Sequence, residues 1–201
     1  MAEGGYYSAM TRAGRYLVIA TALAASAAAA PFAPGTRFGM VGLDCRVSGG
    51  AIYTYSPDSA FAGVDPFFRV GMCVTPNLAL GADLALLKTF PKHGDMFLNT
   101  PVFAFGPVAT WLPAPVGRVQ AYAAAGSGVV YDFELHQGWR FRLSTGALLD
   151  VGLPVTFGPE LGWYADCVRV LRYTGPPWRV EPTWVSGSSF FFGLRLSDLR
   201  L

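Results

Sequence analysis

Apolar and polar residues alternate with a period of two along most of this chain from residue 37 onward. In 37–48, for example, Val41, Leu43 and Cys45 share one parity, whereas Asp44 and Arg46 share the other. This alternation indicates β-strands with one apolar and one polar face. The pattern predicts eight strands, at 37–48, 66–74, 77–88, 102–112, 118–130, 140–151, 155–167 and 188–197.

The lengths of the connections add independent information about the architecture. The links after the second, fourth and sixth predicted strands are short, and the others are longer and richer in Gly, Pro, Asp and Trp. Short turns at one rim and longer loops at the other are typical of outer-membrane barrels. The apolar parity carries the large side chains, which inverts the arrangement of a soluble lipid-binding barrel. We therefore predict an all-β, eight-stranded, antiparallel up-and-down transmembrane β-barrel over 37–201.

Composition agrees with a chain that is partly solvated by lipid. Hydrophobic residues make up 52% of the 201 residues and charged residues 14%, against about 25% charged in ordinary globular proteins. Beyond residue 33 the sequence has no apolar run of the about 20 residues that a membrane-spanning helix needs. Strands are thus the expected membrane-crossing elements.

The amino-terminal region has the layout of a secretory signal peptide. Arg12 and Arg15 precede an apolar stretch at 17–30 that ends in an alanine run with A-x-A cleavage positions. We assign 1–30 to a signal peptide for export by the Sec pathway and 31–36 to a short lead into the barrel. Translation starts at Met1 or at Met10, which begins a more ordinary signal peptide, and an uncleaved anchor helix is the alternative interpretation.

Charged residues on the inward parity are the main candidate site. They comprise five acids and five bases: Asp44, Arg46, Arg69, Asp83, Arg140, Arg142, Asp150, Glu160, Asp166 and Arg195. An unpaired charge in such an interior costs several kcal/mol, and the lumen of an eight-stranded barrel is about wide enough for side chains to fill. The balance predicts a salt-bridge network that plugs the lumen.

The longer loops, at 49–65, 89–100 and 169–185, are the second candidate site. Their candidate contacts with a partner are Tyr53, Tyr55, Phe90, His93, Tyr173, Trp178 and Trp184. The pattern does not identify a loop ligand. Aromatic residues near strand ends are candidates for interfacial girdles or for packing under the loops: Trp111, Tyr131, Trp139, Trp163, Tyr173 and Trp178.

Several classes of site lack support in the sequence. Cys45, Cys73 and Cys167 have no zinc-ligand spacing, so they are interpreted as small apolar side chains, with one disulfide plus one free thiol as the alternative. The formal net charge is only +2 and the basic residues are scattered, which argues against nucleic acid as a partner. No cofactor, metal or catalytic residue is predicted.

Three strand phrases carry a family resemblance: VTPNLALGA at 74–82, AYAAAGSG at 121–128 and FGLRL at 192–196. With them, 37–201 resembles the OmpA/OmpX-like superfamily of small outer-membrane β-barrels. The resemblance implies residence in the outer membrane of a Gram-negative cell, contact with its lipid, and assembly by the barrel-assembly machinery. The final residues, 197–201, depart from the family's usual terminal aromatic residue. We expect no peptidoglycan-binding domain after the barrel, so the cell-wall tethering of larger family members is not carried over.

These observations leave several functions to compare. We expect a monomeric barrel with a structural or interaction role, a sealed interior and exposed loops. A narrow pore for small solutes is the alternative. A lipid A-modifying enzyme is a weaker one, because it needs a nucleophile with a nearby base, and the two histidines, His93 and His136, show no such arrangement. A secreted soluble β-domain is the remaining interpretation.

Overall fold

The alternating segments form long antiparallel strands. The computed structural model describes residues 32–49, 60–87, 89–90, 102–131, 137–174 and 179–199, so the predicted signal peptide lies outside the described residues. The strands are β1 (Arg37–Gly49), β2 (Ala60–Thr75), β3 (Leu78–Leu87), β4 (Thr89–Phe90), β5 (Val102–Trp111), β6 (Val119–Tyr131), β7 (Gln137–Leu149), β8 (Thr156–Thr174) and β9 (Arg179–Ser197). Within these ranges no helix is long and apolar enough to cross a bilayer.

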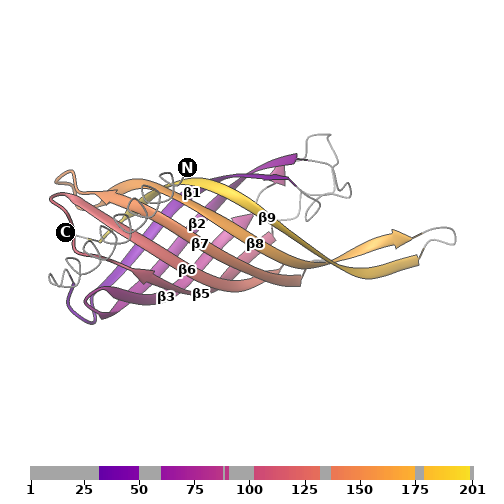
Figure 1. Ribbon diagram of the computed structural model, residues 1–201, viewed down its shortest axis with the longest axis horizontal. Coiled ribbons are helices and arrows are strands. Elements are labelled where there is room, and N and C mark those ends of the chain that lie inside the picture. The colour runs from indigo at the N-terminus through magenta and orange to yellow at the C-terminus, as the bar shows by residue number, and fades with distance from the viewer. Residues whose placement is uncertain are drawn as a thin grey trace, which may run out of the picture.

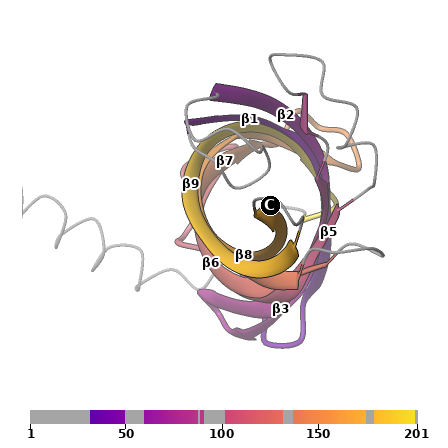
Figure 2. The same cartoon turned by 90° about the vertical axis from the view of Figure 1, so that its right-hand side faces the viewer.

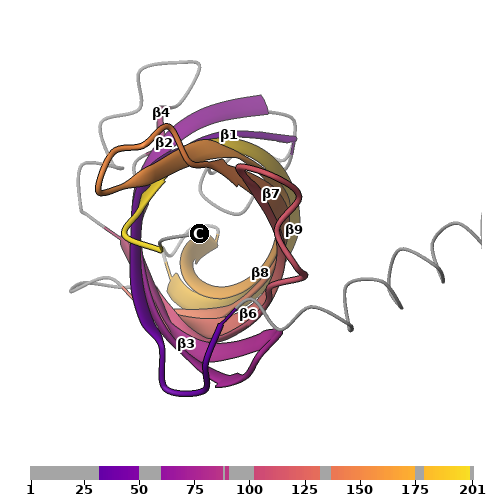
Figure 3. The same ribbon diagram turned by 90° about the vertical axis from the view of Figure 1, so that its left-hand side faces the viewer.

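Apart from β4, each strand pairs with the strands before and after it in the chain, and β1 pairs with both β2 and β9, which closes the sheet. Two-residue β4 pairs with β2 and continues the course of β3, so the barrel has the eight strands that the sequence predicts. Figures 2 and 3 look along the barrel from its two ends and show the closed ring. The up-and-down antiparallel topology is confirmed.

The register gives the geometry of closure. Directly opposite residues can be followed once around the barrel, and the path returns to β1 ten residues further along: Arg37, Met72, Leu80, Ala109, Ala125, Leu143, Trp163, Phe190, Val47. This offset of ten residues is the shear of the barrel. With a rise of about 3.3 Å per residue and strands about 4.8 Å apart, it corresponds to a strand tilt of about 40°. Transmembrane barrels have tilts in this range.

The two faces of the sheet differ as the alternation predicts. Large apolar side chains such as Leu43, Phe141 and Leu194 are more than half exposed on the outside. At the tilt given above, the 13 residues of β6 extend about 30 Å along the barrel axis, which is about the thickness of a bilayer's hydrocarbon core. The outer wall is therefore an apolar belt of membrane-spanning height.

Three predicted strand boundaries were wrong because strands continue into two segments that we assigned to loops. β2 begins at Ala60, not at residue 66. Its Pro66, which suggested a strand start, is tolerated because pairing of β2 with β3 begins only at Phe67 and the missing N–H needs no partner there. β8 and β9 pair with each other as far as Thr174 and Arg179, beyond the last contact of β8 with β7 at Arg169, and form a ribbon that projects from the barrel (Figure 1).

An apolar plug fills the barrel at the end where the short turns lie. Only Pro76 and Asn77 separate β2 from β3, and in the turn between β7 and β8 Gly152 has a φ of +80°, which glycine adopts without steric cost. The plug consists of buried side chains from several strands and from the segments next to β1, β5 and β9: Phe32, Phe38, Met40, Leu112, Leu148 and Leu199.

Candidate functional site in the barrel lumen

The structure places nine of the ten predicted inward charges inside the barrel. Their side chains are at most 6% exposed, except that of Asp83, which is 15% exposed. They lie on β1, β2, β3, β7, β8 and β9: Asp44, Arg46, Arg69, Asp83, Arg140, Arg142, Glu160, Asp166 and Arg195.

The prediction for Asp150 was wrong, and Asp65 takes its place. Asp150 lies beyond the end of β7, and its Oδ1 accepts a hydrogen bond from the N–H of Gly152 at 2.7 Å, so it caps the turn and lies outside the lumen. Asp65 was assigned to a loop, but β2 includes it and buries it completely. Among the described residues the network therefore still holds five acids and five arginines.

Three bidentate ion pairs each join two neighbouring strands. Arg69 on β2 lies directly opposite Asp83 on β3, and its Nε and Nη2 donate to the two carboxylate oxygens at 2.6 and 2.9 Å. Arg140 and Asp166 make the same bidentate contact between β7 and β8, at 2.6 and 2.8 Å. Such paired geometry gives the strongest charge-assisted hydrogen bonds.

The third pair is diagonal rather than directly opposite. Arg46 on β1 donates to Asp65 on β2 through Nε at 2.8 Å and Nη2 at 3.2 Å. Asp65 lies directly across from Asp44, so two carboxylates face one another in the same row. Each has its own arginine, because Arg195 donates to Asp44 from β9.

A central cluster links strands that are not neighbours. Glu160 accepts hydrogen bonds from Arg142 and Arg195, each at 2.6 Å, and from the Tyr122 hydroxyl at 2.8 Å. The Tyr164 hydroxyl donates to Asp44 at 2.6 Å. The cluster thus ties β1, β6, β7, β8 and β9 together across the lumen.

Aromatic rings complete the packing around the arginines, a role that the sequence analysis missed. The guanidinium carbon atoms of Arg142 and Arg195 lie 4.0 and 4.4 Å from the centre of the Phe67 ring. That of Arg140 lies 4.2 Å from the centre of the Tyr164 ring, which stacks on Phe191. These are cation–π distances. The parity of the strands signals that the three aromatic residues point inward, but not which arginines they meet.

Glycines on both sides of Glu160 make room for its partners. Gly146 on β7 and Gly193 on β9 lie directly opposite Glu160. A Cβ at Gly146 would lie 2.6 Å from the Tyr122 hydroxyl oxygen, and one at Gly193 would lie 2.5 Å from Nη1 of Arg195. Any larger residue would displace a ligand of the buried carboxylate.

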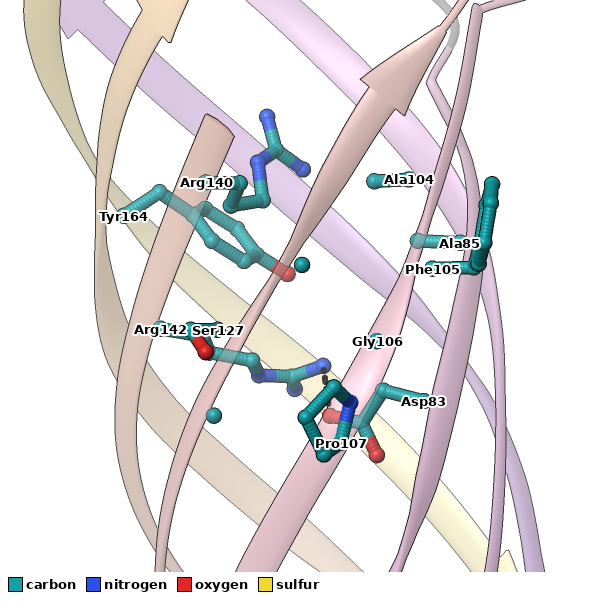
Figure 4. A pocket seen from close by; sticks show the side chains of 12 residues that line it. Asp83, Ala85, Ala104, Phe105, Gly106, Pro107, Ser127, Arg140, Arg142 and Tyr164 are labelled. Carbon is teal, nitrogen blue, oxygen red and sulfur yellow. Dashed lines mark ion pairs between the residues drawn. The ribbon is translucent and has the colours of Figure 1, made fainter. Parts of the chain in front are cut away.

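A cavity of about 30 Å³ remains beside the network. Arg140, Arg142 and Tyr164 line one side, and small residues of β3, β5 and β6, including Ala104 and Gly106, line the other (Figure 4). A buried water needs about 10–15 Å³ of such volume, so this space has room for about two waters. It is far smaller than a channel for solutes.

The structure describes three of the seven predicted loop contacts. Tyr173 and Trp184 lie on the ribbon strands β8 and β9, Phe90 lies on β4, and the Trp184 side chain is exposed. The contacts Tyr53, Tyr55, His93 and Trp178 lie outside the described residues, as does His136. The structure therefore does not bring the predicted loop set together as a described site.

The girdle candidates divide between the two ends and the middle of the outer wall. Trp111 lies at the short-turn end, and Tyr131 and Trp139 lie at the loop end, all exposed. Trp163 lies midway along the pairing of β7 with β8, which runs from Phe157 to Arg169, so it is not an interfacial residue. That prediction was wrong because β8 continues past the end that the sequence suggested.

All three cysteines are free thiols. Cys45 and Cys167 are exposed on the outer wall, whereas Cys73 is buried inside. Among the described residues no group of three His, Cys, Asp or Glu side chains is placed to hold a metal ion. The lumen carboxylates instead bind arginines and tyrosines, an arrangement suited to holding the barrel shut.

The solved structures that this fold resembles are outer-membrane proteins. No model of a known protein family and no curated protein sequence matches the chain. Neisserial surface protein A, a small outer-membrane barrel, is similar over 80% of this chain and 96% of that one, with a TM-score of 0.53 and 14% identity. The outer membrane protein AlkL is similar over 84% of this chain and 90% of its own, with a TM-score of 0.43 and 14% identity. The chain has the fold of a small outer-membrane β-barrel. The transmembrane β-barrel architecture expected from the sequence is confirmed.

Proposed function

We propose that this protein is a monomeric, integral outer-membrane barrel with a structural or interaction role, a sealed lumen and partner contacts at its loop end. The observation that carries the proposal is the charge network, in which Arg142 and Arg195 share the buried carboxylate of Glu160. The apolar plug lies on the short-turn side of the network, so the lumen has two successive barriers to ions.

Residence in the outer membrane follows from the belt and the fold together. An exterior of exposed leucine, valine and phenylalanine is stable only where lipid covers it. Export by the Sec pathway in a Gram-negative cell and insertion by the barrel-assembly machinery would bring the chain there. The ribbon of β8 and β9 beyond Arg169 and the loops would then face the medium, where they are available to a partner.

A narrow pore is the second candidate, because the small-residue wall of β5 and β6 leaves the water-sized cavity beside Arg142. Solute passage would require the arginine to move and the plug to open. The number of ion pairs that such motion would break favours the sealed barrel.

Conductance in planar bilayers separates the two candidates. The sealed barrel predicts no stepwise ion conductance for the wild-type protein or for Phe38→Ala, which opens only the plug, and clear steps for the double variant Phe38→Ala with Arg142→Ala. Asp150→Asn, in the exposed turn, serves as the matched control and should stay closed. Conductance steps in the wild-type protein that change size in Arg142→Ala would instead support the pore.

A further inference from the structure

Charged side chains are rare on the described part of the outer wall. Among the outward-facing residues described on β1 to β9, charge occurs only at Arg37, near the short turns, and at Arg169, near the loop end, and both are exposed. Arg169 lies at the last position where β7 and β8 pair. Arg169 therefore lies at the loop-end edge of the apolar belt, where a bilayer would place its headgroups.

The neighbours of Arg169 provide a mixed polar and aromatic setting. Gln137 on β7 and Trp184 on β9 lie directly opposite it on either side, and opposite residues have Cβ atoms about 4.5–5.5 Å apart. Trp139 lies two positions from Gln137 along β7, on the same face. An amide, a guanidinium and two indole rings thus come together.

A groove lies beside Arg169 on the outer wall, and its lining includes the two cross-strand neighbours of Arg169 but not Arg169 itself. It has a volume of about 390 Å³ and is lined by Phe105, Val129, Tyr131, Gln137, Trp139 and Trp184, among others. This volume lies within the range of about 300–1,000 Å³ that small-molecule sites occupy. The groove lies on the outward face of the strands, so its apolar walls continue into the belt.

We propose that this groove binds one membrane lipid, with the headgroup phosphate on Arg169 and an acyl chain between Trp139 and Trp184. A guanidinium can hold a phosphate through two parallel hydrogen bonds, and the Gln137 amide is placed to add a third. An occupant with one charged end and one apolar end is required, because Arg169 lies beside a groove whose apolar walls face hydrocarbon. The inference rests on the proposed membrane location and names a ligand of the barrel wall.

Native mass spectrometry of the folded protein in a neutral detergent tests the site. The probes are phosphatidylglycerol, diacylglycerol with the same acyl chains, and inorganic phosphate. The wild-type protein should retain one phosphatidylglycerol, and Arg169→Gln should bind it at least about tenfold more weakly, since the positive charge and its two parallel hydrogen bonds to the phosphate are lost. Arg37→Gln, the other outward arginine, should bind it as the wild type does, and Arg169→Lys should recover part of the affinity.

The remaining outcomes separate the alternatives. Equal binding by wild type and Arg169→Gln, or equal weakening in Arg37→Gln, would overturn the site. So would retention of diacylglycerol as tightly as phosphatidylglycerol, or displacement of the lipid by millimolar inorganic phosphate, which would indicate a simple anion site. Gel mobility of unheated samples reports on the barrel separately, so loss of lipid with an intact barrel counts against this inference alone.

Discussion

At the scale of single residues, the lumen pairs each buried charge with a specific partner from another strand. Taking a charge out of water costs several kcal/mol, and only good hydrogen-bond geometry offsets that cost. Arg46 and Asp65 show the consequence, since both are fully buried and make two hydrogen bonds with each other. The pair is therefore expected to be more sensitive to losing one member than to losing both.

A set of substitutions at this pair tests the expectation. Asp65→Asn leaves the arginine buried without its counter-charge and should lower the free energy of unfolding by about 3–5 kcal/mol. The double variant Arg46→Met with Asp65→Leu should recover much of the loss, because apolar side chains replace both charges. Urea unfolding in lipid vesicles measures both, with Asp150→Asn, in the turn after β7, as the control. A double variant as unstable as Asp65→Asn would refute the explanation.

At the scale of strands, the period of two assigns each residue to lipid or to lumen. β7 carries Arg140 and Arg142 inside and Phe141 and Leu143 outside, in four consecutive positions. A shift of one residue in register would exchange the two sets. Burial of arginine inside and of apolar surface in lipid thus stabilise the same register.

Depth along a strand should decide the cost of a charge on its outer face. Leu143→Arg places a cation near the middle of the belt and should destabilise the folded barrel by about 2–4 kcal/mol, whereas Leu149→Arg, at the short-turn end of the same strand, should cost about 0–1 kcal/mol. Unfolding in vesicles measures the difference. Equal costs at the two positions would show that the wall does not face the hydrocarbon as described.

At the scale of the whole molecule, closure through β1 and β9 leaves no open sheet edge within the barrel. Closed barrels satisfy all backbone hydrogen bonds internally, which is what a bilayer requires. Eight strands with a shear of ten also leave an interior that side chains can fill. The ten charges, the aromatic rings and the plug occupy it.

Expression with the amino-terminal segment in a Gram-negative host tests this arrangement as a whole. We expect the protein in the outer-membrane fraction, with a gel mobility that changes when the sample is boiled, because a closed barrel resists the detergent until it is heated. A soluble periplasmic product with no change in mobility would contradict the lipid-facing belt and favour a secreted β-domain.

The sequence by itself determined the class of fold, the strand number and the face on which almost every residue lies. The reason is that side chains alternate strictly along a strand, so inside and outside can be told apart without knowing any contact. Eight strands with balanced inward charges already implied a filled lumen. Errors arose where Pro66 and the Pro- and Trp-rich segment of 169–185 suggested loops, although the strands continue there.

Only the tertiary structure decided which charges meet. Partners in a barrel depend on the register of eight pairings and on the shear, because these set the residues that share a height in the lumen. Glu160 contacts Arg195, 35 positions away, and Asp44 accepts from Tyr164, 120 positions away. No local pattern encodes such pairings, and for the same reason the position of Arg169 between Gln137 and Trp184 emerged only from the folded wall.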